Sequence, residues 1–424
     1  MRSKPTKLIK QKGPITFGLS LFLVSVLIVP TTNAANPDDG YPEGQAAPGR
    51  TCPNNDEGSK QVSAHSGRTL VCTLISGEKK WWVENEPLPV AQSKPVEAKP
   101  AEASKPSDDS KPAEASDDIS DDNMPPGFKH TYSLPAKALT KMKVFNDESY
   151  SSIDSDMRLD IYLPKGIAKP PLMIWVHGGG MIFGNENTIK YDEGAKLLEV
   201  LIKNGIAVAS INYRLATEVP YPVSGQDVKT SIRYLRANAA KYGFNPKKFA
   251  VGGDSAGGYL SLMAAITGNQ KSLFDDPADP NLKTSASVSA VFDLFGNANV
   301  LTMTENKIKY PCQDENDFAY GMDPKMSIWF GDVTLPENRE KVDSANLYPF
   351  LAKNKGLPSF FIFHGTADCS VSKYDSIELD KKVKALKGKS VLKLIPGENH
   401  GGPKIWVEVN KQVPALAKLF ASIK

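Results

Sequence analysis

The stretch GDSAG at residues 253–257 decides the fold, because an extended apolar run precedes it and a helical run follows it. Residues 249–251 read Phe-Ala-Val, which is typical of a short buried strand, and residues 256–267 are rich in the helix formers Ala, Leu and Met. A serine between them lies on a tight strand-to-helix turn, where flanking glycines avoid steric clashes. This turn exposes the Ser255 hydroxyl and directs the positive end of a helix toward whatever the hydroxyl attacks.

A second glycine-rich stretch, HGGG at residues 177–180, directly follows the apolar strand predicted at residues 172–176. Three glycines after a buried strand let backbone N–H groups face a cavity, where they can stabilise a developing oxyanion. We expect the ring of His177 to brace this loop rather than to take part in proton transfer.

A hydrolytic serine needs a base, and the base needs an acid that orients it. The chain contains five histidines, namely His65, His130, His177, His364 and His400. His400 follows a predicted strand at residues 391–395, and Asp368 lies in the stretch HGTAD that follows the strand at residues 360–363. Glu398 is near His400 in sequence, but Asp368 fits the end of a strand better. Ser255, Asp368 and His400 are therefore the predicted catalytic residues.

The region from residue 141 to the C-terminus resembles the α/β-hydrolase esterases of the hormone-sensitive-lipase and feruloyl-esterase-like carboxylesterase groups. The matching stretches are HGGG at 177–180, NYR at 212–214, GDSAGG at 253–258, HGTAD at 364–368 and GENHG at 397–401. One departure is Cys369, which stands where a small or polar residue is more usual.

The resemblance implies a role for each site residue. Ser255 would be the nucleophile, His400 the base and Asp368 its orienting acid, in the chain order of the α/β-hydrolase triad. The N–H groups of Gly179, Gly180 and Ala256 would form the oxyanion hole. The reaction needs no cofactor, and we find no metal-ligand cluster or phosphate loop in the sequence.

Strands and helices alternate along this region. Apolar runs at residues 159–163, 172–176 and 206–211 predict strands, and residues 192–204 and 226–242 predict helices. This alternation predicts an α/β-hydrolase fold with a mainly parallel, doubly wound sheet, whose active site lies at the carboxyl ends of the strands.

Other polar and aromatic residues receive structural interpretations. We expect Arg214 and Asp227 to form a structural ion pair and Asp254 to act as a hydrogen-bonding residue of the turn. Residues 296–355 lack regular alternation and are predicted to shape the substrate pocket, with some of their aromatic side chains in the core. These aromatic residues are Tyr310, Phe318, Tyr320, Trp329 and Phe330.

The N-terminus predicts export. Five basic residues precede an apolar run at residues 15–29, and Thr-Asn-Ala at residues 32–34 resembles a cleavage site, so residues 1–34 form a predicted signal peptide. An uncleaved membrane anchor is the alternative. Removing the five positive charges of this segment from the formal charge of +3 leaves −2. We therefore expect a secreted or periplasmic protein that has no nucleic-acid partner.

Two further regions separate the signal peptide from the hydrolase domain at residues 128–424. Residues 35–90 predict a small β-rich module with a hairpin, and residues 91–127 are a Pro-, Ala- and Lys-rich linker that is too polar to fold. Trp81 and Trp82 of the module form either the core of its small sheet or a surface that stacks on the sugars of cell wall or polysaccharide.

Export makes the four cysteines candidates for disulfides. Cys52 and Cys72 lie in the same small module and are expected to pair there. Cys312 and Cys369 lie in the hydrolase region, where a bridge would tie the acid-bearing loop to an insertion. Two unpaired thiols are the alternative for this second pair.

These features predict an exported serine carboxylic-ester hydrolase that acts on a small-molecule or carbohydrate-linked ester. A peptidase with prolyl-oligopeptidase-like chemistry shares the triad order, but the region before residue 159 is too short for the β-propeller of those enzymes. A second alternative is a non-enzymatic cell-wall-binding or glycan-binding protein on a hydrolase scaffold. Labelling by a fluorophosphonate probe separates this binding protein from an enzyme, because only an activated serine reacts.

Overall fold

The computed structural model describes residues 60–62, 69–75, 78–83, 123–124, 128–309, 329–330 and 339–424. Contacts divide the chain into two units, Met1–Pro112 and Ala113–Lys424. The predicted signal peptide, nearly all of the linker and the side chains of Cys52, Cys72 and Cys312 lie outside the described parts, as do Tyr310, Phe318 and Tyr320.

The first unit contains a three-stranded sheet in the order β1-β2-β3, with β1 at Lys60–Val62, β2 at Thr69–Ile75 and β3 at Glu78–Val83. Both pairs are antiparallel, and Ile75 lies opposite Glu78 at the end of the β2–β3 pair. Only residues 76 and 77 separate the two strands, which is the spacing of a tight hairpin.

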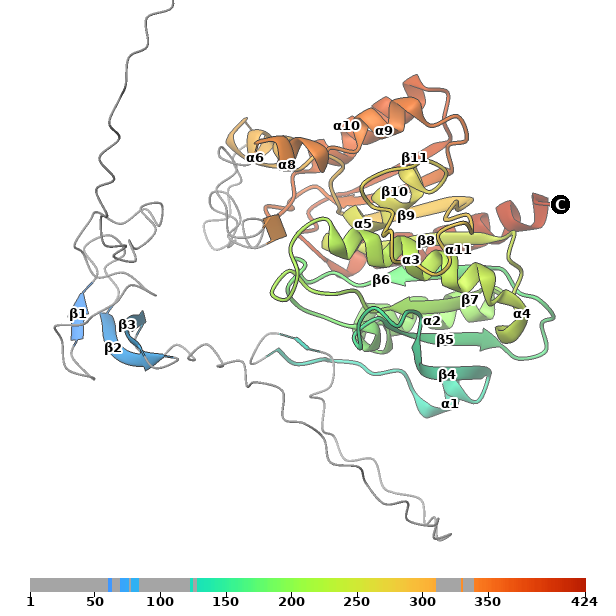
Figure 1. Ribbon diagram of the computed structural model, residues 1–424. Coiled ribbons are helices and arrows are strands. Elements are labelled where there is room, and N and C mark those ends of the chain that lie inside the picture. Colours follow the sequence, from blue (N-terminus) through green and yellow to red (C-terminus); the bar gives the residue numbers. More distant parts are fainter. Residues whose placement is uncertain are drawn as a thin grey trace, which may run out of the picture. The chain divides into compact units, whose positions relative to one another are not determined.

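The second unit is built on an eight-stranded sheet with the order β11-β10-β9-β8-β6-β7-β5-β4 (Figure 1). The strands are β4 (Met142–Ser149), β5 (Arg158–Pro164), β6 (Leu172–Val176), β7 (Ala207–Ile211), β8 (Phe249–Asp254), β9 (Ala290–Leu294), β10 (Ser359–Gly365) and β11 (Ser390–Ile395). β5 pairs antiparallel with both of its neighbours, and all other pairs are parallel. The predicted mainly parallel sheet is confirmed.

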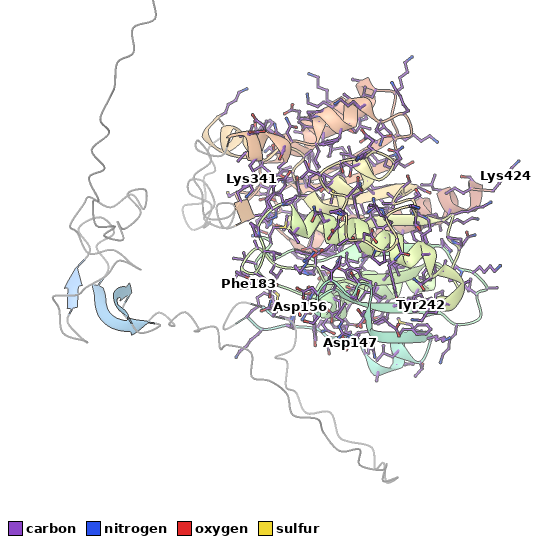
Figure 2. All side chains as sticks on the ribbon, in the orientation of Figure 1. Asp147, Asp156, Phe183, Tyr242, Lys341 and Lys424 are labelled. Atoms are coloured by element: carbon purple, nitrogen blue, oxygen red, sulfur yellow. The ribbon has the colours of Figure 1, made fainter. Side chains whose placement is uncertain are left out.

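Helices cover both faces of this sheet (Figure 1). They are α1 (Ala136–Leu139), the 3-10 helix η1 (Glu186–Lys190), α2 (Asp192–Lys203), α3 (Val223–Ala237), α4 (Ala239–Tyr242), α5 (Ala256–Thr267), α6 (Val300–Lys309), α8 (Arg339–Ser344), α9 (Tyr348–Lys353), α10 (Lys373–Ala385) and α11 (Pro403–Ser422). Among the described helices, none is long and apolar enough to cross a membrane. Figure 2 shows the side chains between the layers and Lys424 extending from the C-terminal end.

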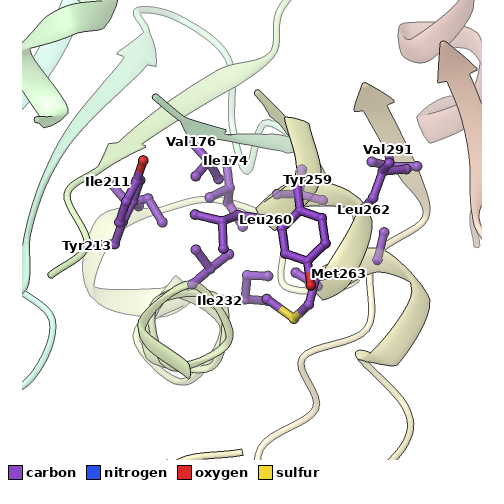
Figure 3. Packing of buried hydrophobic residues seen from close by; sticks show 14 of the residues in the cluster. Ile174, Val176, Ile211, Tyr213, Ile232, Tyr259, Leu260, Leu262, Met263 and Val291 are labelled. Carbon is purple, nitrogen blue, oxygen red and sulfur yellow. The ribbon is translucent and has the colours of Figure 1, made fainter. Parts of the chain in front are cut away.

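Alternating side chains of the strands build a separate core on each face, because successive residues of a strand point to opposite sides. In β6, Ile174 and Val176 belong to the core under α3 and α5, whereas Trp175 belongs to the core under α2 and α11. Figure 3 shows Ile174 and Val176 packed with Ile232 of α3 and Leu260 of α5. The sheet is thus buried on both faces, as its continuous apolar strands predict.

The structure corrects one predicted element. The helix predicted at residues 226–242 begins earlier, at Val223, and is divided at Asn238. At the division, the backbone N–H and the side-chain amide of Asn238 both donate to the Tyr234 carbonyl, each at 2.9 Å, and Asn238 itself departs from helical backbone angles with φ −100° and ψ 13°.

Residues 296–355 lack regular alternation in the sequence and were predicted to shape the substrate pocket, with some of their aromatic side chains in the core. The described part of this segment contains α6, α8 and α9. Trp329 and Phe330 are buried core residues. The indole N–H of Trp329 donates to the Ser224 hydroxyl at 3.0 Å, which ties this residue to α3.

Candidate active site

Ser255 lies in the turn between β8 and α5 with φ 53° and ψ −117°. Residues other than glycine rarely adopt such backbone angles, and they are found where a functional side chain must be held outside regular structure. The Ser255 N–H donates to the Leu294 carbonyl at 2.9 Å, so the turn is tied to the end of the neighbouring strand β9.

The positions on either side of this serine, 253 and 257, have no room for a side chain. A Cβ atom on either Gly253 or Gly257 would overlap with the carbonyl oxygen of Val176, the last residue of β6. The start of α5 therefore lies directly against the strand that leads into the glycine loop. This close approach explains the G-x-S-x-G pattern in physical terms.

The structure brings Ser255, His400 and Asp368 together, although they are far apart in sequence. The Ser255 Oγ lies 2.9 Å from His400 Nε2, and His400 Nδ1 lies 2.8 Å from Asp368 Oδ2. Ser255 follows β8, Asp368 follows β10, and His400 follows β11, so all three residues lie at the carboxyl ends of strands. Each contact has hydrogen-bond length, and together they form a continuous chain.

The Asp368 carboxylate is buried and saturated with donors. Its Oδ1 accepts the backbone N–H groups of Ser370 and Val371, each at 2.9 Å, and its Oδ2 faces His400. Burial by itself would raise the pKa of Asp368, but the charge of protonated His400 and hydrogen bonds from His364 and His400 lower that pKa well below its usual value. Asp368 is therefore ionised at neutral pH.

Glu398, the rejected candidate for the acid, has a different role. Its Oε1 pairs with the Lys404 ammonium at 2.9 Å, and its Oε2 accepts the Lys404 backbone N–H at 3.1 Å. Lys404 is in the first turn of α11, where a carboxylate stabilises exposed N–H groups. Glu398 thus caps a helix rather than orienting His400.

The glycine loop after β6 adopts backbone angles that favour glycine. Gly179 and Gly180 have φ of 103° and 65°, which glycine adopts without strain. Within the described residues, neither donates its N–H group to another backbone or side-chain acceptor. Ala256 is the first residue of α5, and its N–H group has no partner inside the helix for that reason.

His177 braces this loop, as expected. Its ring stacks on Tyr213 with centroids 4.3 Å apart, and the Tyr213 hydroxyl donates to the His177 carbonyl at 3.1 Å. Burial lowers the pKa of His177 to about 4, so the ring is neutral near pH 7. Asp254 accepts the N–H group of Gly178 and is also a hydrogen-bonding residue.

The predicted ion pair of Arg214 and Asp227 is present. The guanidinium of Arg214 contacts both carboxylate oxygens of Asp227, at 2.6 Å and 2.9 Å. This pair holds the chain after β7 against α3, and among the described residues no hydrogen bond joins it to the triad, so its role is structural.

Sequence reasoning missed two neighbours of the triad. The ring of Phe295 meets the ring of His400 edge to face, with centroids 4.7 Å apart. His364 lies 3.2 Å from Asp368 Oδ2. The sequence placed His364 at the end of a strand, but only the folded chain shows that it contacts the acid.

Cys369, directly after the acid, is in a disulfide. The side chain of its partner lies outside the described residues. Within the part of the chain that the structure describes, no group of three or more His, Cys, Asp or Glu residues could hold a metal ion.

The mainly parallel sheet, the strained serine turn and the serine–histidine–aspartate chain define an α/β-hydrolase. The sequence model of the BD-FAE family matches residues 159–383, which is more than half of the 424 residues. The chain therefore belongs to the BD-FAE family of esterase-like α/β-hydrolases.

Relatives and solved structures agree with this assignment. Esterase LipC of Mycobacterium tuberculosis is 28% identical over 256 residues, covering 58% of this chain and 57% of LipC. A truncated carbohydrate esterase from gut microbiota is 27% identical with a TM-score of 0.58, covering 68% of this chain and 100% of that one. LAE6, an α/β-hydrolase enzyme from a lake metagenome, shares the fold at 22% identity and a TM-score of 0.51, covering 68% and 87%. The chain spans about half to two thirds of the length of the first curated relatives that it matches.

We predict that Asp368→Asn lowers kcat by about 10³-fold or more, whereas Glu398→Gln changes kcat less than about threefold. The first change removes the charge that orients His400 Nδ1, and the second affects only a helix cap. Initial rates on a soluble acetyl ester measure both effects, and circular dichroism melting checks folding. The reverse ranking of the two variants would assign the acid to Glu398.

Proposed function

We propose that this protein is a serine carboxylic-ester hydrolase, with Ser255 as nucleophile, His400 as general base and Asp368 as the orienting acid. The observation that carries the proposal is the chain of contacts from Ser255 Oγ to His400 Nε2 and from His400 Nδ1 to Asp368 Oδ2. Because the ionised Asp368 accepts the Nδ1 hydrogen, the lone pair of Nε2 is directed at the serine hydroxyl.

The reaction has two acyl-transfer steps. His400 takes the proton of Ser255 while the oxygen attacks the ester carbonyl, and His400 then gives this proton to the departing alcohol. A water molecule repeats the sequence on the acyl-enzyme and releases the acid. The N–H groups of Gly179, Gly180 and Ala256 would stabilise the negative oxygen that forms in each step.

We propose a small-molecule or carbohydrate-linked ester as the substrate. Esterase LipC, carboxylesterase NlhH and the carbohydrate esterase from gut microbiota are all similar to this chain, which favours esters over peptides. A panel of acetyl, butyryl, feruloyl and long-chain esters on sugar and simple alcohols identifies the acyl group and the alcohol. Cleavage of peptides but of no ester in this panel would overturn the assignment.

Ser255→Ala is expected to leave the fold intact and to reduce ester hydrolysis by at least about 10³-fold, because no other group can form the acyl-enzyme. A fluorophosphonate probe should label the wild-type protein once per chain and leave the variant unlabelled. Retention of more than about one hundredth of the wild-type rate would exclude Ser255 as the nucleophile.

We also propose that the protein is exported, with residues 1–34 removed and Cys369 paired with Cys312. A basic segment before an apolar run supports export, and the disulfide at Cys369 fits an oxidising compartment. Non-reducing peptide mapping of the secreted protein should give an N-terminus at Ala35 and a linked Cys312–Cys369 peptide. An intact Met1 would indicate a retained anchor, and a different link would reject the pairing.

The module at residues 35–90 is proposed to contact cell wall or polysaccharide, with residues 91–127 as its spacer. Deletion of residues 35–127 should therefore change kcat/KM on a soluble acetyl ester less than about twofold. On a polysaccharide slurry the same deletion should lower the rate about tenfold or more, because tethering raises the effective substrate concentration. Loss of soluble-ester activity would instead make the module part of the catalytic unit.

A further inference from the structure

The triad acid has a second histidine partner. His364 is the second-to-last residue of β10 and is fully buried. Its Nε2 lies 3.2 Å from Asp368 Oδ2 and 2.9 Å from the Val371 carbonyl oxygen. Both neighbours are acceptors, so Nε2 must carry a hydrogen that it donates to them.

The other ring nitrogen of His364 is also held. Nδ1 lies 2.7 Å from the Ser376 Oγ on α10, a hydroxyl that can accept from a charged ring or donate to a neutral one. His364 thus connects the rigid end of β10 to the loop that bears Asp368 and to the helix that follows it. The ring has no freedom to rotate without losing these contacts.

The hydrogen-bond partners of Asp368 hold its carboxylate in a single orientation. Ser370 and Val371 donate their N–H groups to Oδ1, while His400 and His364 approach Oδ2. His364 therefore shares with His400 the oxygen that orients the proposed base. A substitution at His364 would therefore affect the proposed base, His400, through Asp368 Oδ2.

The surroundings of His364 are acidic. Asp368 contacts His364 directly. The charge of His364 also acts on the carboxyls of Asp293 in β9 and Asp375 in α10, which are both fully buried. Within the described residues, Asp293 Oδ2 and Asp375 Oδ2 have no hydrogen-bond partner, nor has the Tyr348 hydroxyl of α9. Burial and the charges of Glu378, Asp375 and Asp293 raise the pKa of this hydroxyl.

These groups favour a charged ring at His364. Burial alone would lower the pKa of His364, but the hydrogen bond and charge of Asp368, the Val371 carbonyl and the charge of Asp293 together raise it above its usual value. For the two carboxyls burial acts in the opposite direction, and it raises the pKa of Asp293 to about 7 and that of Asp375 to about 6. A raised pKa means that the imidazolium persists to higher pH than in an unfolded chain.

We propose that His364 is a positioning residue of the triad: as an imidazolium it holds Asp368 Oδ2 in place and offsets part of the negative charge that His400 experiences. The proposal deepens the hydrolase function proposed above and rests on it. The proton stays on His364 throughout the reaction. Without this positive charge, more net negative charge would lie beside His400.

The test compares His364→Gln with His130→Gln. The glutamine amide can still donate toward Asp368 and Val371 but carries no charge. His130 is a matched control, because its Nδ1 pairs with the Asp192 carboxylate at 2.7 Å at the start of α2, outside the triad. The readouts are the pH profile of kcat/KM on a soluble ester and an NMR titration of the histidine side chains.

In His364→Gln we expect the acid-side midpoint of the kcat/KM profile to rise by about one pH unit, and kcat to fall about tenfold. The His400 ring signal should titrate about one pH unit higher by NMR, while His130→Gln leaves both midpoints unchanged. An unchanged profile in a folded His364→Gln variant would show that His364 only fills space, and would overturn the proposal.

Ser376→Ala keeps the imidazole and removes only its Nδ1 partner, so it tests the proposal if His364→Gln fails to fold. A smaller shift in the same direction is expected, and no shift would overturn the proposal. In the wild-type protein, a His364 ring that is neutral at pH 6 would also overturn it. The NMR readout needs no turnover, so it judges His364 even if Ser255→Ala shows that the hydrolase assignment is wrong.

Discussion

The site depends on one close backbone approach. Val176 at the end of β6 lies opposite Gly253 at the end of β8, and its carbonyl oxygen leaves no room for a Cβ at Gly253 or Gly257. The turn bearing Ser255 and the loop bearing Gly179 and Gly180 are therefore attached to two paired strands at the same edge. Paired strands are rigid, so they set the distance between the attacking serine oxygen and the N–H groups that would stabilise the resulting oxyanion. This distance then does not depend on flexible side chains.

The rest of the triad is added from further along the same edge of the sheet. In the strand order, β9 separates β8 from β10, and β11 follows β10. β9 contributes to the site through its end, because Leu294 accepts the N–H of Ser255 and Phe295 packs against His400. Asp368 lies in a loop, outside regular secondary structure. Four donors to its carboxylate nevertheless hold its negative charge in one position.

Local chemistry made the central part of this arrangement predictable. The strand-to-helix serine turn, the glycine loop and the polar residues at strand ends each have a sequence signature, and parallel strands bring their carboxyl ends to one edge. β4 and β9 were missed for different reasons. β4 alternates irregularly between buried and exposed residues across a bulge, and β9 follows a long irregular segment with only five residues of its own. The contact between His364 and Asp368 depends on how the loop after β10 folds back on that strand. The spacing of apolar residues in the sequence carries no information about this fold of the loop.

The connection from β9 to β10 has a wider consequence. It leaves one edge of the sheet after Leu294, passes through α6, α8 and α9, and returns at Ser359 to a strand that pairs directly with β9. Because both ends are fixed by neighbouring strands, the length of the crossover can change at little entropic cost and without moving either strand. An exchange of this one crossover between relatives would therefore leave β9, β10 and the reacting atoms beyond them in register.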